Sequence, residues 1–418
     1  MTTTNLATNP RLTKELNLAL TKGFRVTALG FTLGNWGDTA SMGIRKQLEN
    51  DHRDNFKWIE LDATPSHWFG WFLWGLSEKL ARKIYPFFKN NIFINALANT
   101  RRAVQLVRAA NRSGFRPDLI IAHNMGTLYP AYRLGKIRNI PFIFDIEDYH
   151  PGESVSKDKD NEKKRREFLL RKLLPIAKAI TSASPLIEKY TLNLIGGHPN
   201  HKVILNSFPD SEFSSPIIQK SNQEEPLKLT WFGQKIGPGR GLEQLFRALA
   251  DLSKLDLAPI YLTLIGDWDP KFKNDVFLPL QKTIDNTSFM VQTWEPIPQR
   301  ELHLQLGHYD IGLAMELIGT DLNRQLCLTN KIMAYAQAGL YILATDTGAQ
   351  SRFINQDPNR GVLCGQSSSE IHQALEKIIK NREAIISGKG DRYKNGRKLC
   401  WEQAATKLSG LWNDVIKG

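Results

Sequence analysis

The sequence predicts an α/β fold of two doubly wound, Rossmann-like domains that face one another across a cleft. Short apolar segments alternate with amphipathic helical segments, the pattern of parallel sheets covered by helices. The 418 residues are enough for two full hydrophobic cores. A polar segment at 209–226, rich in Pro, Ser, Gln and Glu, is typical of a linker. We therefore expect one domain over 1–208 and a second over 227–397.

The composition narrows the class of protein. With 41% hydrophobic and 23% charged residues the chain is globular. Cys327, Cys364 and Cys400 lack any paired spacing, which favours a reducing cytosol over a disulfide framework or a zinc site. We find neither an apolar run of about 20 residues nor a signal-peptide pattern. A net charge of +13 predicts an anionic partner, and nucleic acid, phosphate-rich small molecules and acidic lipid all qualify.

In the first domain, Asn9 and Pro10 form a cap and first turn for a helix that runs to about Thr21. Strands follow at Phe24–Phe31 and Lys57–Asp62. A helix at Arg101–Ala110 comes before a buried strand within 116–124, which delivers His123 at its carboxyl end. Ligands bind at that end of parallel strands, so a binding role and a structural role are both open for His123.

The segment from His67 to Lys89 is unusual. Trp68, Trp71 and Trp74, with the apolar residues between them, are too crowded for one face of a strand, and cations follow at helical spacing. Tryptophan with lysine is typical of an amphipathic segment that lies on an anionic membrane. An aromatic-rich core helix and an acceptor pocket are the alternatives.

The rest of the first domain includes a strand at Ile140–Ile146, which ends in the acidic side chains of Asp145, Glu147 and Asp148. Three carboxylates so close together leave a metal site as one interpretation, which we do not favour. The charge run at 157–166 indicates a solvated loop and helix start. Further strands are expected at 180–185 and 203–206.

The second domain opens with a strand at Leu227–Phe232, a glycine-rich turn at 233–241 and a helix at Leu242–Leu252. Backbone amides in such a turn can approach an anion closely, although a tight turn alone would also explain the glycines. The turn matches neither a Walker A motif nor a dinucleotide fingerprint. The remaining elements are strands and helices at 260–265, 289–293, 361–364, 371–379 and 401–416.

The segment 310–350 predicts a strand at Ile311–Ala314, a polar loop, a helix over Lys331–Ala338 and a buried strand at Tyr341–Ala344. Thr329 and Asn330 are suitable N-caps, which leaves Lys331 in the first helical turn. A cation there is unfavourable unless an anion such as phosphate neutralises it. A crossover helix whose lysine points to solvent is the alternative.

The run from Asn330-Lys331 through Tyr335 and Gly339 to Asp346-Thr347-Gly348 resembles the donor-site segment of retaining nucleotide-sugar glycosyltransferases of the family 4-like (group 1), bacterial type. The resemblance implies the GT-B fold. It also implies a hexosyl transfer from a nucleotide-diphosphate-sugar to a polysaccharide, lipid-linked or other cell-envelope acceptor, with no cofactor and no metal. One position departs from the pattern, since the family's ribose-binding Glu corresponds to Ala334.

The resemblance also implies roles for single residues. His123 would be the catalytic group that lines the donor sugar, and Gln292 and Thr293 would lie near the nucleobase. Gln234 stands where relatives have an Arg, and Glu147 where they have a His. The implied donor-binding residues are Gly233, Lys235, Arg240, Glu316, Thr329, Asn330 and Lys331.

Relatives also have a central strand before the first helix and a last helix, here about 398–418, that crosses back to the first domain. Only Met1–Thr4 remains to supply that strand. Either a stub forms or the natural start lies upstream, and we expect the second, because a missing central strand leaves backbone groups unpaired.

Other functions compete with sugar transfer. A nucleotide-sugar epimerase shares the architecture, a non-catalytic nucleotide-sugar binder is favoured by Ala334, Gln234 and Glu147, and a nucleic-acid-binding protein is favoured by charge alone. We expect as partners a nucleotide sugar, a glycan or lipid-linked acceptor and an anionic membrane surface, and no nucleic acid. The expected location is the cytoplasm, at the inner face of the cell membrane.

Overall fold

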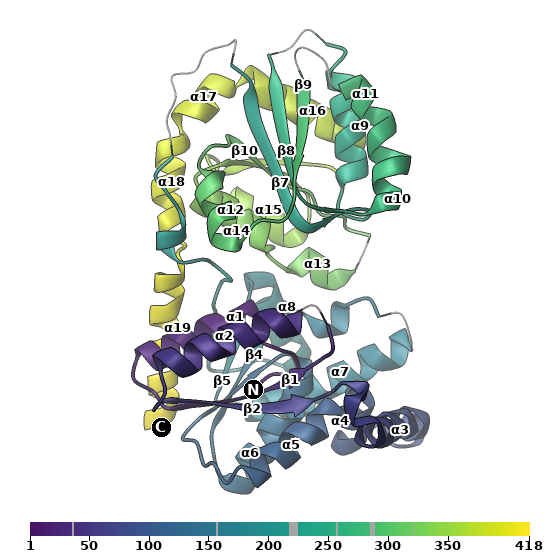
Figure 1. Cartoon of the computed structure of the whole chain (residues 1–418), viewed down its shortest axis with the longest axis vertical. Helices are drawn as coiled ribbons and strands as arrows, with labels where there is room; N and C mark the ends of the chain where they lie inside the picture. The colour runs from purple at the N-terminus through teal and green to yellow at the C-terminus, as the bar shows by residue number, and fades with distance from the viewer. Residues whose placement is uncertain (36, 156–157, 217–224, 256–257, 285–288, 320) are drawn as a thin grey trace. The chain divides into compact units, whose positions relative to one another are not determined.

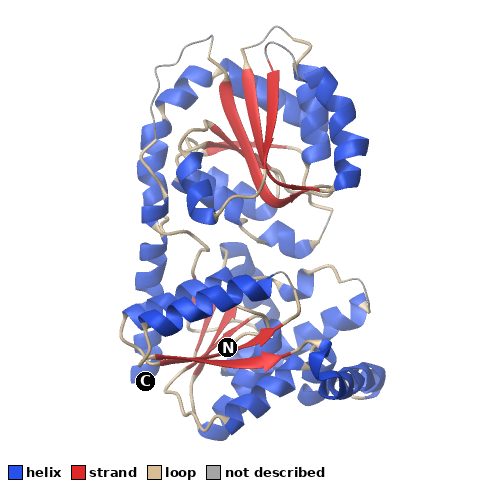
Figure 2. Cartoon of the chain, viewed as in Figure 1, coloured by secondary structure: helices blue, strands red, loops and turns tan. Residues whose placement is uncertain are grey.

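The computed structural model describes residues 1–35, 37–155, 158–216, 225–255, 258–284, 289–319 and 321–418 (Figures 1 and 2). The chain divides into two compact units. The N-terminal unit comprises Met1–Ile204 and Ala405–Gly418, and the C-terminal unit comprises Leu205–Ala404. Part of the polar segment expected as a linker, 217–224, lies outside the described residues.

The sheets of the N-terminal unit are parallel. Strands pair in the order β3-β4-β5-β6, and β1 pairs with β2. The bounds are β1 (Val26–Thr32), β2 (Phe56–Asp62), β3 (Ile120–His123), β4 (Phe142–Ile146), β5 (Ala179–Ser182) and β6 (His201–Val203).

The first residues of the chain bridge these two sheets. The Met1 amine donates to the Ile121 carbonyl (2.7 Å), and Thr2 forms a parallel bridge to His123. On the other side the Thr2 N–H donates to the Leu29 carbonyl (3.0 Å). The stub therefore forms and satisfies backbone groups of both neighbours. Beside it lies a cavity of about 410 Å³ between β1, β3, the helix α1 (Pro10–Thr21) and the last helix α19 (Trp401–Lys417), lined mainly by apolar side chains.

Helices pack around these strands (Figure 2). The first helix begins as predicted, because the Asn9 side chain accepts from the Leu12 N–H and Pro10 fills the first position. The helices of the unit are α1 (Pro10–Thr21), α2 (Gly37–Asp51), α3 (Trp68–Ile84), α4 (Ile92–Asn99), α5 (Arg102–Arg112), α6 (Leu128–Arg138), α7 (Lys159–Leu173) and α8 (Pro185–Ile195), and α19 (Trp401–Lys417) joins them from residue 405 on.

The C-terminal unit has one parallel sheet in the order β12-β11-β10-β7-β8-β9. β10 is buried throughout and β11 is buried from Ile342 to Thr345, as expected when helices cover both faces of a parallel sheet. The bounds are β7 (Leu227–Ile236), β8 (Ile260–Trp268), β9 (Phe289–Trp294), β10 (Ile311–Ala314), β11 (Tyr341–Thr345) and β12 (Gly361–Cys364).

Helices of this unit pack closely against the sheet. The Tyr335 ring lies where a Cβ on Gly312 would be, 2.3 Å from the nearest ring carbon, so this β10–α14 contact requires glycine. The helices are α9 (Leu242–Leu252), α10 (Pro270–Phe272), the π-helical η7 (Lys273–Phe277), α11 (Leu278–Ile284), α12 (Gln299–Leu306), α13 (Leu322–Leu326), α14 (Asn330–Gln337), α15 (Gly348–Asn355), α16 (Ser368–Lys380), α17 (Arg382–Ser387) and α18 (Lys389–Arg397).

Several predicted boundaries differ from those of the structure, among them the bounds of β1, β4 and β6, and the difference at β7 bears on the candidate site. β7 does not end at Phe232 but continues to Ile236, with a register shift against β8 between Phe232 and Lys235. The two strands approach very closely there, since a Cβ on Gly266 would lie 2.3 Å from the Gly233 carbonyl oxygen. Gly233 and Lys235 are therefore strand residues, and the glycine-rich turn starts only at Gly237.

The cysteines are free thiols, as expected from their spacing. Among the described residues, no helix combines the length and the apolar character needed to cross a bilayer.

Candidate functional site

The carboxyl ends of the parallel strands in the C-terminal unit share one edge of the sheet, where ligands bind in such folds. The turn after β7 contributes Arg240, which is half-buried between Gly239 and Gly241. Both glycines have a positive φ, +72° and +71°, and a Cβ on Gly241 would lie 3.0 Å from the Met315 Cβ. The glycines thus let the chain turn into α9 close to the residues that follow β10.

Lys331 lies in the first turn of α14, and its side chain is buried. The Lys331 Nζ is 3.2 Å from Glu316 Oε1 and lies over the Trp231 ring, 5.3 Å from its centroid. Burial lowers the pKa of Lys331, and the charges of Arg240 and Arg324 lower it further, while Glu316 opposes them. The alternative of a solvent-facing lysine is wrong, because Lys331 is buried and pairs with Glu316.

Arg324 was not identified from the sequence. It lies on α13, a helix of five residues that starts at the N-cap Asp321, and its Nη1 donates to the Gly239 carbonyl (3.3 Å). The contact joins α13 to the glycine-rich turn. Arg240 and Arg324 therefore add positive charge around Lys331. Glu316 pairs with Lys331, and Glu243 Oε1 accepts from the Gly239 N–H (3.3 Å) in the adjoining turn. The three cations outnumber these two carboxylates, so an anion would be favoured there.

The start of α14 adds hydrogen-bond donors to these cations. Thr329 is the N-cap, but its side chain makes no capping hydrogen bond, and its buried Oγ1 has no partner among the described residues. Asn330 is the first helical residue, one position earlier than predicted, and its Oδ1 accepts from Asn206 Nδ2 (2.9 Å). A helix start without a side-chain cap is a ready anion site, because the first amides have no intrahelical acceptor.

Both the backbone N–H and the backbone carbonyl of Glu316 form hydrogen bonds with Thr345. Its N–H donates to Thr345 Oγ1 (2.8 Å), and the same hydroxyl donates to its carbonyl (2.6 Å). Gln350 Nε2 in turn donates to the Thr345 carbonyl (2.9 Å). Thr345 and Gln350 therefore fix the backbone of Glu316, whose carboxylate pairs with Lys331. Neither residue was singled out from the sequence.

The other predicted donor residues lie further from this group. Gln292 donates to Thr263 Oγ1 (3.0 Å), and Thr293 is exposed; both are on the edge strand β9, with β7 and β8 between it and β10. Lys235 is exposed near the carboxyl end of strand β7. Ala334 is fully buried within an apolar cluster, so no carboxylate stands at the position where the resembling family has its Glu.

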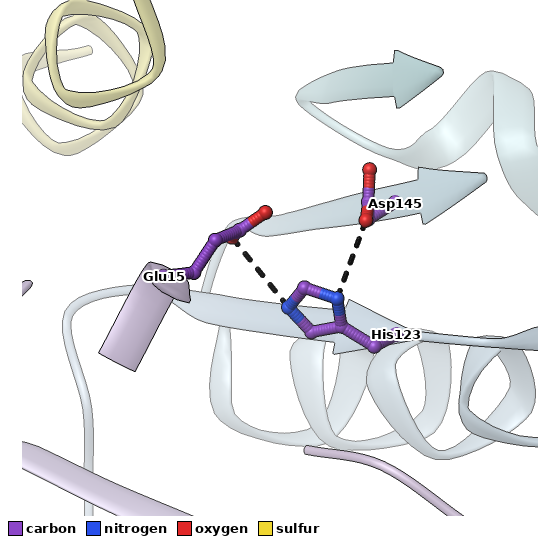
Figure 3. A group of neighbouring side chains, drawn as sticks. All are labelled: Glu15, His123 and Asp145. Atoms are coloured by element: carbon purple, nitrogen blue, oxygen red, sulfur yellow. Dashed lines mark ion pairs between the residues drawn. The ribbon is translucent and has the colours of Figure 1, made fainter. Parts of the chain in front are cut away.

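The N-terminal unit holds a second charged group, at the ends of β3 and β4 (Figure 3). The buried Arg11 guanidinium donates to both oxygens of Asp145 (2.6 and 2.8 Å). His123 Nδ1 is 3.0 Å from Glu147 Oε1 and 3.3 Å from Asp145 Oδ2, and its Nε2 is 3.5 Å from Glu15 Oε2.

The pKa values follow from this enclosure. Burial alone would lower the pKa of His123, but Glu15, Asp145 and Glu147 raise it well above 6.5, so the ring is an imidazolium. Burial would raise the pKa of Asp145, but Arg11 and His123 hold it well below its usual range. The raised pKa of His123 and the lowered pKa of Asp145 have the same cause, which is that cations and carboxylates pair with one another in this cluster.

This cluster bears on two of the sequence-based interpretations. Oxygen and nitrogen atoms of Glu15, His123 and Asp145 lie close enough together to share a metal ion. However, Asp145 already accepts two hydrogen bonds from Arg11, and the buried guanidinium would repel a metal cation, so the residues present do not fit a metal. The His123 ring is 1% exposed, and its predicted contact with a donor sugar stays a prediction.

The three tryptophans predicted to contact a membrane or an acceptor all lie on α3. The Trp68 side chain is 69% exposed and Trp71 is 41% exposed. Trp71 and Trp74 are each covered by a guanidinium group, from Arg101 at 5.1 Å and Arg108 at 4.6 Å.

Comparison with known proteins places the fold. No family model and no curated protein sequence matches the chain. Among solved structures it is similar to Anabaena HepE in complex with UDP (TM-score 0.64, 13% identity, 99% of both chains) and to a glycosyltransferase from Rickettsia africae (0.63, 13%, 100% and 97%). It is also similar to sucrose-phosphate synthase from Thermosynechococcus elongatus (0.56, 16%, 75% and 78%). These matches confirm the predicted GT-B fold class.

Proposed function

We propose that the protein is a glycosyltransferase that moves a sugar from a nucleotide-diphosphate-sugar to an acceptor. The observation that carries this proposal is the grouping of Arg240, Arg324 and Lys331 with Glu316 at the carboxyl ends of β7 and β10, where the cations outnumber Glu316 and the nearby Glu243. A surplus of buried and half-buried cations is unfavourable unless an anion binds, and a pyrophosphate carries the matching charge.

The chemistry of the reaction calls for such a site. Cleavage of the bond between sugar and phosphate develops positive charge on the sugar and negative charge on the leaving diphosphate. Fixed cations and the amides at the start of α14 stabilise that negative charge without reorganising. Removal of one donor of this kind typically costs about 3 kcal/mol of transition-state stabilisation. In this proposal the nucleotide sugar is a substrate and no cofactor takes part.

The similar structures support a nucleotide donor. HepE was crystallised with UDP, with UDP and glucose, and with UDP-glucose, and starch synthase IV from Arabidopsis thaliana with ADP and acarbose. We propose that the nucleobase lies near Gln292 and Thr293, and that Gly233, Lys235, Thr329 and Asn330 complete the donor site.

The finer features of the proposal come from the sequence resemblance. They are family 4-like chemistry, retention of the anomeric configuration, hexosyl transfer and a polysaccharide, lipid-linked or other cell-envelope acceptor, with a role in polysaccharide biosynthesis. We further propose a cytoplasmic enzyme that works peripherally on the inner face of the membrane.

A non-catalytic nucleotide-sugar binder is the second candidate, and one observation favours it. Ala334 is fully buried among apolar side chains, so a bound ribose would lack the carboxylate partner that the resembling family provides. Such a protein would keep the diphosphate site and lose turnover.

The test is incubation with a panel of UDP-, ADP- and GDP-sugars together with membrane-extracted glycan and lipid acceptors. Release of nucleoside diphosphate together with a glycosylated product, whose anomeric configuration is read by NMR, supports the proposal. An interconverted donor without transfer would select the epimerase instead. Tight calorimetric binding without any product would select the non-catalytic binder.

A further inference from the structure

The N-terminal unit exposes a concentrated apolar surface. Among the described residues, 21 large hydrophobic side chains are exposed, and ten of them lie within residues 68–93. Exposed hydrophobic residues are normally scattered singly, and contiguous patches mark interaction sites. The surface belongs to α3, to the 3-10 turn η2 (Tyr85–Phe87) and to the residues just after it.

The geometry of α3 gathers most of these side chains on one side. With about 100° per residue, six apolar residues fall within an arc of about 140°. All six are more than 45% exposed. We call this arc the docking face; it consists of Trp68, Phe69, Phe72, Leu73, Leu76 and Leu80. A core helix would bury such an arc, whereas among the side chains described in α3 only that of Ala81 is buried.

The opposite side of α3 is attached to the unit by specific contacts. Arg101 donates from its guanidinium to the Trp71 carbonyl (2.8 Å) and from its backbone N–H to Glu78 (2.9 Å). Arg82 donates to the Ala98 carbonyl (2.9 Å) and pairs with Glu78 (2.9 Å). These contacts set the rotation of the helix, so the docking face is directed away from the protein.

Charge selects the kind of partner. Lys79 and Lys83 are exposed and fall within the same arc as Phe72 and Leu76, and Lys89 follows next to the exposed Phe87 and Phe88. Glu78 is the only acidic residue between 68 and 89, and Arg82 neutralises it. An apolar surface interspersed with lysines is complementary to acyl chains beneath anionic headgroups.

We propose that α3 and η2 form a docking element that lies flat on an anionic lipid surface and inserts the docking face at the level of the headgroups. The lysine stems extend along the apolar surface and bring their ammonium groups to lipid phosphates. The inference does not rest on sugar transfer, and it would hold equally for a non-catalytic protein.

The structure also divides the three tryptophans. Trp68 has a free side and belongs to the docking face, whereas Arg101 and Arg108 cover Trp71 and Trp74. The sequence-based expectation of three equivalent anchors is therefore replaced by one tryptophan that inserts and two that hold the helix to the protein.

The experiment is flotation of the full chain with vesicles of phosphatidylcholine alone and of phosphatidylcholine with 30 mol% phosphatidylglycerol, a composition of about one anionic lipid in three. We expect the wild type to float with the anionic vesicles only. The triple variant Trp68→Ser/Phe72→Ser/Leu76→Ser is expected to bind at least tenfold more weakly. Lys79→Gln and Lys83→Gln should each weaken binding about fivefold, with less effect at high salt.

A matched control removes three exposed apolar side chains elsewhere. Met42→Ser/Leu255→Ser/Met290→Ser should leave flotation unchanged. A wild type that ignores anionic vesicles overturns the proposal, and so does a triple variant that floats as well as the wild type. A wild-type dimer in solution that the triple variant dissociates, without any vesicle binding, would show that a second copy covers the docking face and would also overturn it.

Discussion

The two units each gather charged side chains at the carboxyl ends of their strands, but the two groups are built differently. In the N-terminal unit two cations and three carboxylates are linked to one another by contacts of 2.6 to 3.7 Å; they are Arg11, His123, Glu15, Asp145 and Glu147. In the C-terminal unit the charges of Arg240 and Arg324 act on Lys331, which pairs with Glu316, and Glu243 accepts from Gly239 in the adjoining turn, so three cations outnumber two carboxylates.

The difference separates a structural charge cluster from a binding site. A buried charge is tolerated when its partners are part of the fold, and the first group meets that condition by itself. The second group is left with an excess of positive charge, and the charges of Arg240 and Arg324 add to burial in lowering the pKa of Lys331. We infer that the first group stabilises the fold and that the second is completed by a ligand.

The largest effect should come from breaking the closed cluster. Asp145→Asn removes the acceptor charge that Arg11 pairs with and leaves a buried guanidinium uncompensated. We expect a loss of about 3–5 kcal/mol in the free energy of unfolding of the N-terminal unit, measured by urea denaturation.

The control for this experiment is an exposed ion pair in the same unit. Glu60→Gln removes the partner of Arg45 at the surface and should change stability by less than about 1 kcal/mol. If Asp145→Asn unfolds at the same urea concentration as the control, the cluster is not structural and the comparison between the two groups fails.

A smaller effect, on binding rather than stability, is expected in the open group. Arg240→Gln should weaken calorimetric binding of UDP or ADP by about 1.5–3 kcal/mol, roughly 10- to 100-fold, because a charged hydrogen bond to phosphate is lost. Lys331→Met combined with Glu316→Gln should do the same without leaving a buried charge unpaired.

Arg247→Gln is the matched control, since Arg247 is exposed on the neighbouring helix α9. Stability should respond in the opposite way to affinity, because Arg240→Gln relieves repulsion of Lys331. Unchanged nucleotide affinity in both site variants would show that the excess charge serves another purpose.

The smallest effect concerns pH. The pKa of His123 is raised in the folded state by Glu15, Asp145 and Glu147. Its stabilising contribution is therefore fully present below pH 6.5 and is lost as the pH rises through the folded value. The difference in unfolding free energy between the wild type and His123→Gln should shrink above neutral pH.

His201 in the same unit provides the opposite sign. Burial, with a further contribution from the charge of His198, lowers its pKa to about 4. Its contribution is present above pH 6.5 and is lost as the pH falls toward 4.

For His123, a difference in unfolding free energy between the wild type and His123→Gln that stays constant from pH 6 to 10 would mean that the His123 ring is neutral in the fold.

Local sequence predicted those parts of the fold that local physics determines. The bounds of α9, β10 and β12 agree with the prediction, because each is an apolar run between clear turn signals. The extension of β7 through Gly233 was not predictable, since it depends on close contact with Gly266 of the next strand. The stub at Met1–Thr4 forms for a similar reason, because it bonds to Leu29 in β1 and to Ile121 in β3, which are distant in the sequence.

The candidate site shows the same limit. Arg240 and Lys331 were identified because a glycine-rich turn and a helix start have local signatures. Arg324 lies on a five-residue helix too short to have a hydrophobic period, and its contact with Gly239 spans 85 residues. The pairing of Glu316 with Lys331, and the support from Thr345 and Gln350, depends on the ends of β10 and β11 meeting the starts of α14 and α15.

The ion pair between Glu316 and Lys331 has a consequence for the proposed transfer. A diphosphate that binds as proposed must compete with the Glu316 carboxylate for contact with the lysine. After the proposed transfer, renewed pairing of Glu316 with Lys331 would favour release of the nucleoside diphosphate. A chain with Glu316→Gln would therefore grip its product more tightly and cycle more slowly, which inhibition by added nucleoside diphosphate would reveal; equal inhibition of both proteins would argue against it.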